Sequence, residues 1–204
     1  MVSDHGFRPI EREIRPNVLL VKAGLLTADA DGNVIGGKIA TVANGGSFFI
    51  YLPKDGAEDL LHEVDTALKP LRDQGLAGAV LDHAALNRLS ADPDAQLALD
   101  APEGASFSDD TSGDLVGRLP TTEGTHGGMS SSRGLESSFI AWGPGIKAGV
   151  DLHGIPMTRI GPTILKAMRI NDPKFGDGPP IHEIFRLSGE QFSEGGGMDH
   201  GGGE

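Results

Sequence analysis

The sequence predicts an α/β fold in which helices cover a β-sheet. Apolar runs typical of buried strands alternate with segments of helical periodicity, as over residues 47–52 and 56–73. Two short Gly-bounded motifs, at 3–6 and 124–127, carry carboxylate and imidazole groups in the loops of this pattern. Because ligand-binding loops of α/β folds collect at the carboxyl edge of the strands, we expect both motifs to lie there.

Residues 7–30 are expected to form a loop followed by a short helix. Pro16 suits a first helical turn because that position needs no backbone N–H donor, and Gly24 ends the apolar run of the helix. The sequence Asp-Ala-Asp-Gly-Asn at 29–33 has the composition of a tight turn.

Two strands and the clearest helix of the chain follow. Strands are expected over 38–42 and 47–52, and the continuous apolar and aromatic run of the second indicates a buried strand. Residues 56–73 have helical periodicity, with charges on the opposite side. The face predicted to be buried consists of Leu60, Leu61, Val64, Leu68 and Leu71.

The second half of the chain has weaker patterns. A helix is expected around 82–89, and residues 90–123 are expected to form mostly short strands and turns. The apolar and aromatic run at 139–142 predicts a core strand. A further helix is expected over 162–168, again with proline in its first turn.

One domain is expected over residues 1–187. The length of 204 residues allows one domain with a substantial core and is short for two. From residue 188 onward, repeated glycine leaves too little apolar surface to offset the entropy of ordering. Residues 188–204 are therefore expected to be a disordered tail.

The composition excludes several classes of partner and site. The formal net charge of −12 argues against a nucleic acid polymer, whose phosphates need clustered Lys and Arg. A small phosphate ester stays open, because bound divalent cations would supply positive charge. The absence of cysteine excludes thiolate zinc sites, and no apolar run is long enough to span a bilayer. Neither observation separates a periplasmic or secreted location from a cytoplasmic one.

The candidate metal ligands are Asp4 and His5 in the first motif and His126 in the second. Carboxylate and imidazole groups bind zinc, and the adjacent glycines allow the backbone to approach an ion. An Asp-His pair is common by chance, and this chain has two more, at 82–83 and 199–200. The first of these is placed to cap a helix, and the second lies in the glycine-rich tail. The interpretation of Asp4 and His5 as metal ligands depends on the motifs that follow them in the sequence.

Three other groups of polar residues are expected to have no catalytic or metal-binding role. Glu58, Asp59 and His62 lie on the helix face opposite the apolar residues, where solvated charges are usual. His153 and His182 have no acidic or histidine neighbours at ligand spacing. The run Ser130-Ser131-Ser132 lacks the turn that exposes a nucleophilic serine, and it is expected to be a polar loop.

Taken in order, the motifs of the chain resemble the alkaline phosphatase superfamily, most closely the type I phosphodiesterase and nucleotide pyrophosphatase branch. The similarity covers nearly all of 1–187 and corresponds to the C-terminal portion of that domain. It implies an alkaline-phosphatase-like layered α/β/α sheet. The motifs that carry it are Asp4-His5-Gly6, Pro16-Asn17-Val18-Leu19-Leu20, Asn44-Gly45-Gly46-Ser47, Gly124-Thr125-His126-Gly127, Phe139-Ile140-Ala141-Trp142-Gly143-Pro144-Gly145 and Pro162-Thr163-Ile164.

The resemblance implies a hydrolase of phosphoric esters that uses two divalent metal ions, usually zinc, with manganese as the alternative. Asp4 and His5 would bind the ion that activates a Thr or Ser nucleophile, and His126 would bind the other ion. In the family, the nucleophile and the remaining ligands precede the Asp-His-Gly motif. This chain therefore contains no catalytic nucleophile at a matching position, and we expect the missing N-terminal half of the enzyme to supply it. The substrate class implied is a small phosphate ester or a nucleotide-like molecule.

One departure and two alternatives accompany the resemblance. Gly128-Met129 stands where the branch often has an aromatic residue and a proline, which leaves the substrate undefined. Other superfamily members act on sulfate or phosphonate esters or isomerise phosphosugars. Outside enzymes, the chain could be a catalytically inactive metal-binding or interaction domain derived from the family. We expect the isolated chain to have no phosphoester hydrolase activity.

Overall fold

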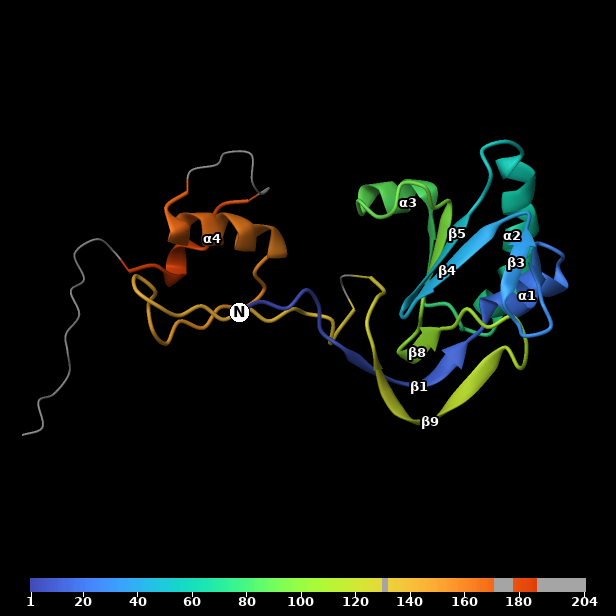
Figure 1. Cartoon of the computed structure of the whole chain (residues 1–204), viewed down its shortest axis with the longest axis horizontal. Helices are drawn as coiled ribbons and strands as arrows, with labels where there is room; N and C mark the ends of the chain where they lie inside the picture. The colour runs from blue at the N-terminus through green and yellow to red at the C-terminus, as the bar shows by residue number, and fades with distance from the viewer. Residues whose placement is uncertain (130–131, 171–177, 187–204) are drawn as a thin grey trace, which may run out of the picture. The chain divides into compact units, whose positions relative to one another are not determined.

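The computed structural model describes residues 1–129, 132–170 and 178–186. It is a mixed α/β structure with several sheets and four α-helices in the described ranges (Figure 1). The chain divides into a main unit, Ser3–Ser138, and a second unit composed of Met1–Val2 and the residues from Phe139 onward. Among the described residues, no helix is long and apolar enough to cross a membrane. The predicted tail at 188–204 lies outside the described residues.

The main unit contains a four-stranded antiparallel sheet. Its strands are β4 (Ala40–Asn44), β5 (Ser47–Tyr51), β7 (Leu97–Asp100) and β6 (Ala79–Asp82), in this spatial order. The strand predicted over 47–52 is confirmed as β5, and the one predicted over 38–42 begins and ends two residues later as β4. A tight turn at Gly45 and Gly46 joins these two strands.

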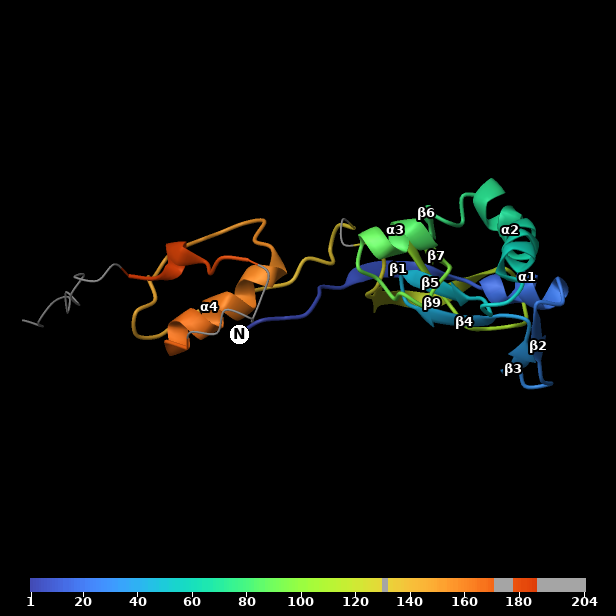
Figure 2. The same ribbon diagram turned by 90° about the horizontal axis from the view of Figure 1, so that it is seen from above.

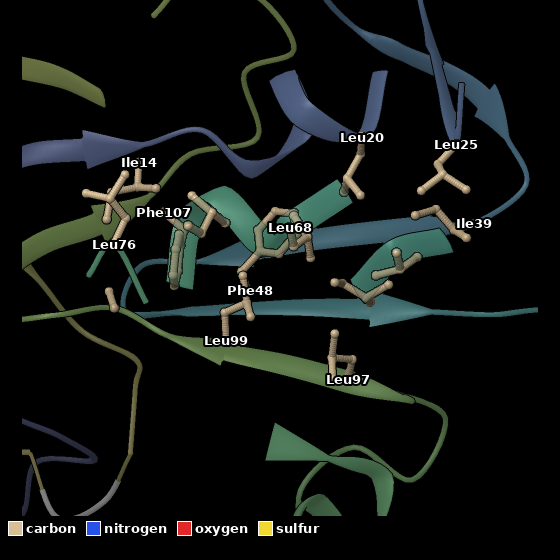
Figure 3. Close-up of a cluster of buried hydrophobic side chains, with 14 of the residues drawn as sticks. Ile14, Leu20, Leu25, Ile39, Phe48, Leu68, Leu76, Leu97, Leu99 and Phe107 are labelled. Carbon is tan, nitrogen blue, oxygen red and sulfur yellow. The ribbon is translucent and has the colours of Figure 1, made fainter. Parts of the chain in front are cut away.

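Helices cover both faces of this sheet. The predicted long helix is confirmed as α2 (Ala57–Asp73), and its buried side chains Val64, Leu68 and Leu71 belong to the main apolar core. Figure 3 shows Leu68 in this core near Phe48 of β5. Leu61 was expected in this face but is 39 % exposed. On the other face, α3 (His83–Arg88) packs Leu86 against a smaller apolar cluster. The larger apolar core, on the side of α2, also contains Ile14, Leu20, Leu25, Ile39, Phe48, Ile50, Leu97, Leu99 and Phe107.

The predicted first helix is confirmed as α1 (Pro16–Lys22), with proline in its first turn. It leads into a hairpin of β2 (Leu26–Ala28) and β3 (Val34–Gly37), which projects from the rest of the main unit in Figure 2. The predicted turn at 29–33 joins these strands. Asp29 Oδ1 accepts hydrogen bonds from the backbone N–H groups of Asp31 and Asn33, which fixes the turn.

A second sheet of three strands has the order β8-β1-β9. Its centre is β1 (Arg8–Ile14), which is parallel to β8 (Gly104–Phe107) and antiparallel to β9 (Val116–Thr125). The prediction of a loop after residue 7 is therefore wrong for 8–14. Proline and four charged side chains interrupt the apolar pattern of this strand, and it forms because it is paired on both edges.

The second unit contains α4 (Ile160–Met168) and two short 3₁₀ turns, η1 (Met157–Arg159) and η2 (His182–Ile184). The helix predicted over 162–168 is thus confirmed with an earlier start. The core strand predicted at 139–142 is wrong. Phe139 makes an isolated bridge with Val2, and the Ile140 N–H donates to the carbonyl oxygen of Met1, but this pairing does not extend into a strand. Ile140 and Trp142 are 49 % and 75 % exposed, so the run is not a buried core strand.

Candidate metal site

The pairing of β1 with β9 brings the two predicted ligand motifs together. Arg8 at the start of β1 is paired with Thr125 at the end of β9, so the residues just before β1 and just after β9 are neighbours. His5 lies before the first residue of β1, and His126 follows the last residue of β9. The expectation that both motifs lie at the carboxyl ends of strands is therefore wrong for His5. The two motifs meet because the strands are antiparallel.

The imidazole rings of His5 and His126 are stacked, with their centroids 4.7 Å apart and their planes inclined by 24°. Phe7 packs edge-on against both rings, at centroid distances of 5.2 Å to His5 and 6.0 Å to His126. Both histidines are partly buried, whereas Phe7 is 62 % exposed. The site is thus a small aromatic cluster, open to solvent on the side of Phe7.

Asp4 and His5 present two ligand atoms to one region. Asp4 Oδ2 lies 3.5 Å from His5 Nε2, and Asp4 Oδ1 accepts a hydrogen bond from the His5 backbone N–H at 3.0 Å. His5 Nδ1 is 2.8 Å from the carbonyl oxygen of Gly6. Because a carbonyl can only accept, Nδ1 carries the proton in this hydrogen bond, and Nε2 of the neutral ring keeps its lone pair. This is how a metal-binding histidine is usually oriented.

Gly6 allows the first motif to lie against another main-chain segment. A Cβ atom at this position would lie 2.5 Å from the carbonyl oxygen of Gly134 and 2.9 Å from that of Glu136. The Gly6 N–H donates to the carbonyl oxygen of Leu135 at 3.0 Å. Gly6 does not adopt a positive φ, so glycine is needed here for close approach and not for a left-handed turn.

The second motif packs against the turn between β4 and β5. The Gly46 N–H donates to the carbonyl oxygen of His126 at 2.7 Å. A Cβ atom at Gly45 would overlap the same carbonyl oxygen, and one at Gly127 would overlap the carbonyl oxygen of Asn44. Gly127 and Gly128 also have φ values of +75° and +99°, which favour glycine. The motif Asn44-Gly45-Gly46-Ser47 is thus the surface on which the His126 loop rests.

Two side chains complete the support of this loop. Ser47 Oγ accepts a hydrogen bond from the Gly128 N–H at 2.8 Å, and Asp100 Oδ1 accepts one from the Met129 N–H at 2.8 Å. Burial raises the pKa of Asp100, while the Met129 hydrogen bond and the charge of Arg8 act in the opposite direction. The main chain of loop residues 126–129 is therefore contacted along its whole length, by the β4–β5 turn and by the side chains of Ser47 and Asp100.

The donor types suit zinc, since zinc binds both the hard carboxylate oxygen and the borderline imidazole nitrogen. These three candidate ligands are fewer than a complete two-metal centre needs. Within the described ranges, no group of three or more His, Cys, Asp or Glu side chains is arranged to hold one ion. A catalytic zinc usually takes three protein ligands, so Asp4 with His5, and His126 by itself, would each be part of a ligand set.

The second Asp-His pair, at Asp82 and His83, has the structural role that the sequence predicts. Asp82 Oδ1 accepts a hydrogen bond from the Ala85 N–H at 2.7 Å and caps α3. His83 Nδ1 lies 2.9 Å from the carbonyl oxygen of Ala95, so the ring is tied to the main chain. The third pair, at Asp199 and His200, lies outside the described residues.

A shallow groove of about 650 Å³ lies between α2 and the β6–α3 segment. Glu58 and His62 line it, while Asp59 is an exposed residue of the same helix. Two further carboxylates of the groove are engaged elsewhere, because Asp65 pairs with Arg72 at 2.8 Å and Asp82 caps α3.

The remaining histidines are exposed and lie in the second unit. His153 Nε2 is 3.6 Å from Asp151 Oδ2, so the expectation that His153 has no acidic neighbour is wrong. His182 Nδ1 is 3.0 Å from Lys166 Nζ. In the serine run, Ser130 and Ser131 lie outside the described residues, and the Ser132 N–H donates to the carbonyl oxygen of Met129.

The chain matches no protein-family model, and no curated protein or solved structure was found to match it. The candidate site therefore rests on its own geometry and on the motifs. Phe7, Arg8 and Asp100 are parts of the site that the sequence did not predict. For Phe7 and Arg8 the sequence holds one signal, since both directly follow the first motif, and for Asp100 it holds none.

Proposed function

We propose that this chain supplies part of the metal shell of a metal-dependent phosphoric ester hydrolase, of the phosphodiesterase and nucleotide pyrophosphatase type. Asp4 and His5 bind one divalent ion, and His126 binds a second. The observation that carries this proposal is the stacking of His5 on His126 at 4.7 Å, because the two motifs lie at opposite ends of the main unit's sequence. In the same proposal, the fold is the C-terminal part of an alkaline-phosphatase-like layered α/β/α sheet.

When bound, two zinc ions, or manganese in their place, activate a Thr or Ser nucleophile and neutralise charge on the phosphoryl group. The residues of this chain hold and orient the donor atoms. The Gly6 carbonyl fixes the proton of His5 on Nδ1 and leaves Nε2 for an ion. Phe7 limits the rotation of both imidazoles by packing edge-on against them. The nucleophile and the other ligands come from outside residues 1–204, and the substrate is a small phosphate ester or a nucleotide-like molecule.

Zinc titration of the purified chain tests the ligand assignment. We expect His5→Ala and His126→Ala to weaken zinc binding by more than the roughly 10–100-fold that loss of an outer-shell partner costs. His83→Ala is the matched control, because His83 also follows an aspartate but is tied to the main chain. It should leave zinc affinity unchanged. Unchanged zinc affinity in a chain lacking Asp4, His5 and His126 would contradict the proposal.

Two further results separate a hydrolase from a domain that only binds metal. The purified chain should not turn over an activated phosphodiester, and turnover abolished by His126→Ala would contradict the placement of the nucleophile outside this chain. The source DNA in frame before the Met1 codon should encode an Asp, a Thr or Ser, and an Asp-x-x-x-His pair. A stop codon with a ribosome-binding site at that point would favour the metal-binding domain.

A further inference from the structure

Two charged side chains lie against the His126 loop without belonging to the ligand set. Arg8 is 8 % exposed, and its Nη2 donates to the carbonyl oxygen of Ala101 at 3.3 Å. Asp100, the residue before Ala101, is partly buried and accepts the hydrogen bond from the Met129 N–H. Each of these residues is the end of a different strand, since Arg8 begins β1 and Asp100 ends β7.

Both side chains contact the glycines that shape the site. A Cβ atom at Gly46 would lie 2.8 Å from Arg8 Nη2. A Cβ atom at Gly128 would lie 2.9 Å from Asp100 Oδ1 and 3.7 Å from Arg8 Nη2. The guanidinium and the carboxylate therefore both lie close to Gly128, on the side to which a Cβ atom of that residue would point.

The burial of the Arg8 guanidinium is energetically unfavourable by itself. Arg8 Nε is buried and has no hydrogen-bond partner within the described residues. A buried charge with an unmet donor is unfavourable unless an opposite charge lies near, and Asp100 is the carboxylate whose charge interacts with Arg8. Replacing one member alone would leave the other charge uncompensated.

We propose that Arg8 and Asp100 are positioning residues, which hold the backbone of 126–129 so that the His126 imidazole is presented beside His5 for metal binding. The part of this inference that concerns metal binding rests on the proposed function. Gly127 and Gly128 give the loop a high conformational entropy when it is free. The carboxylate of Asp100 removes part of that freedom through Met129, and the positive charge of Arg8, which lies near Gly46 and Gly128, favours the ionised form of that carboxylate.

Substitutions at Asp100 test the hydrogen bond to the loop. In the metal-free chain, Asp100→Ala should increase amide hydrogen exchange at Met129 by at least roughly tenfold, because its N–H loses a charged acceptor. The same variant should lower zinc affinity by about 10–100-fold. Asp100→Asn keeps an acceptor oxygen and should restore most of the protection at Met129. Asp110→Ala is the matched control, since Asp110 pairs with Arg15 at 2.8 Å in the same unit but away from the loop. It should change neither quantity.

A double-mutant cycle tests the joint role of the two charges. The combined Arg8→Met and Asp100→Asn variant should lose less zinc affinity than the product of the two single losses, because only the single variants strand a buried charge. Independent losses that simply multiply would contradict the pairing.

The outcomes separate this inference from the proposed function. If Asp100→Ala leaves Met129 exchange and zinc affinity within about twofold of the wild-type values, the inference is wrong while the ligand assignment stands. If amide exchange at Met129 is as fast in Asp100→Asn as in Asp100→Ala, the hydrogen-bond role is wrong. If the wild-type chain binds no zinc, the proposed function is wrong, and the exchange of Met129 alone decides whether these residues position the loop.

Discussion

At the scale of single residues, Asp100 shows how the candidate site is tied to stability. Its carboxylate is partly buried, and burial raises its pKa more than the Met129 hydrogen bond and the Arg8 charge lower it. The folded chain therefore binds a proton at Asp100 more readily than the unfolded chain does. Such a group favours folding most below its unfolded pKa, and this contribution is lost as the pH rises through the folded pKa.

This linkage predicts a pH dependence that Asp100→Asn removes. The wild-type free energy of unfolding, minus that of Asp100→Asn, should decrease as the pH rises from about 3 to about 7. Urea unfolding of both proteins over this range measures the difference, and the subtraction cancels the titration of the other carboxylates. A difference that grows with pH would mean that the folded pKa of Asp100 is lowered.

The sequence could suggest candidate ligand residues but not the residues that support them. Asp4, His5 and His126 stand out because their types and glycine neighbours suit metal binding. Arg8 and Asp100 lie in strands, and apart from the position of Arg8 just after the first motif, nothing in their local sequence distinguishes them from exposed charges. Their role arises from the packing of the β4–β5 turn against the His126 loop, which depends on pairings between distant strands.

At the scale of elements, the contact between the His126 loop and the β4–β5 turn is made by main chain on both sides. The two segments approach so closely that Cβ atoms at Gly45, Gly46 and Gly127 would each meet a backbone carbonyl oxygen. Rigid backbone cannot yield as a long side chain can. The loop and the turn should therefore form or fail together.

Gly127→Ala should break this contact. Its Cβ would overlap the Asn44 carbonyl oxygen, and its φ of +75° is strained for alanine, so the free energy of unfolding should fall by about 2 kcal/mol or more. Gly75→Ala is the control, because Gly75 has a φ of +64° but no atom near its Cβ position. Its cost should be the strain alone, about 1 kcal/mol. Equal losses in urea unfolding would show that the main-chain contact adds nothing.

Elements with a strong local pattern were predicted well. The helix α2 and the strand β5 have clear periodicity or a continuous apolar run, and both were placed within a residue or two. The strands β1 and β9 were missed or split because they contain proline, glycine and charged residues. Conversely, the run at 139–142 looked like a core strand but has only one bridge. Strand formation depends on partners, and local sequence does not show which partners are present.

At the scale of the whole molecule, the two units differ in how they are stabilised. The main unit has a large apolar core shared by α1, α2 and both larger sheets. In the second unit, the buried apolar side chains among the described residues are Ile181 and Ile184, and several apolar side chains of α4 are exposed. The candidate site is built entirely by the main unit, so its geometry depends on the better-packed part of the chain.

The net charge of −12 makes the presence of a cation at the site chemically reasonable. The most direct test of the central proposal is an anomalous difference map from crystals of the chain soaked with zinc. We expect zinc about 2.0–2.2 Å from His5 Nε2 and from an Asp4 carboxylate oxygen, and zinc bound to the imidazole of His126. Zinc found only at other places, such as Asp151 with His153 or the Asp82–His83 segment, and none at His5 or His126, would contradict the proposal.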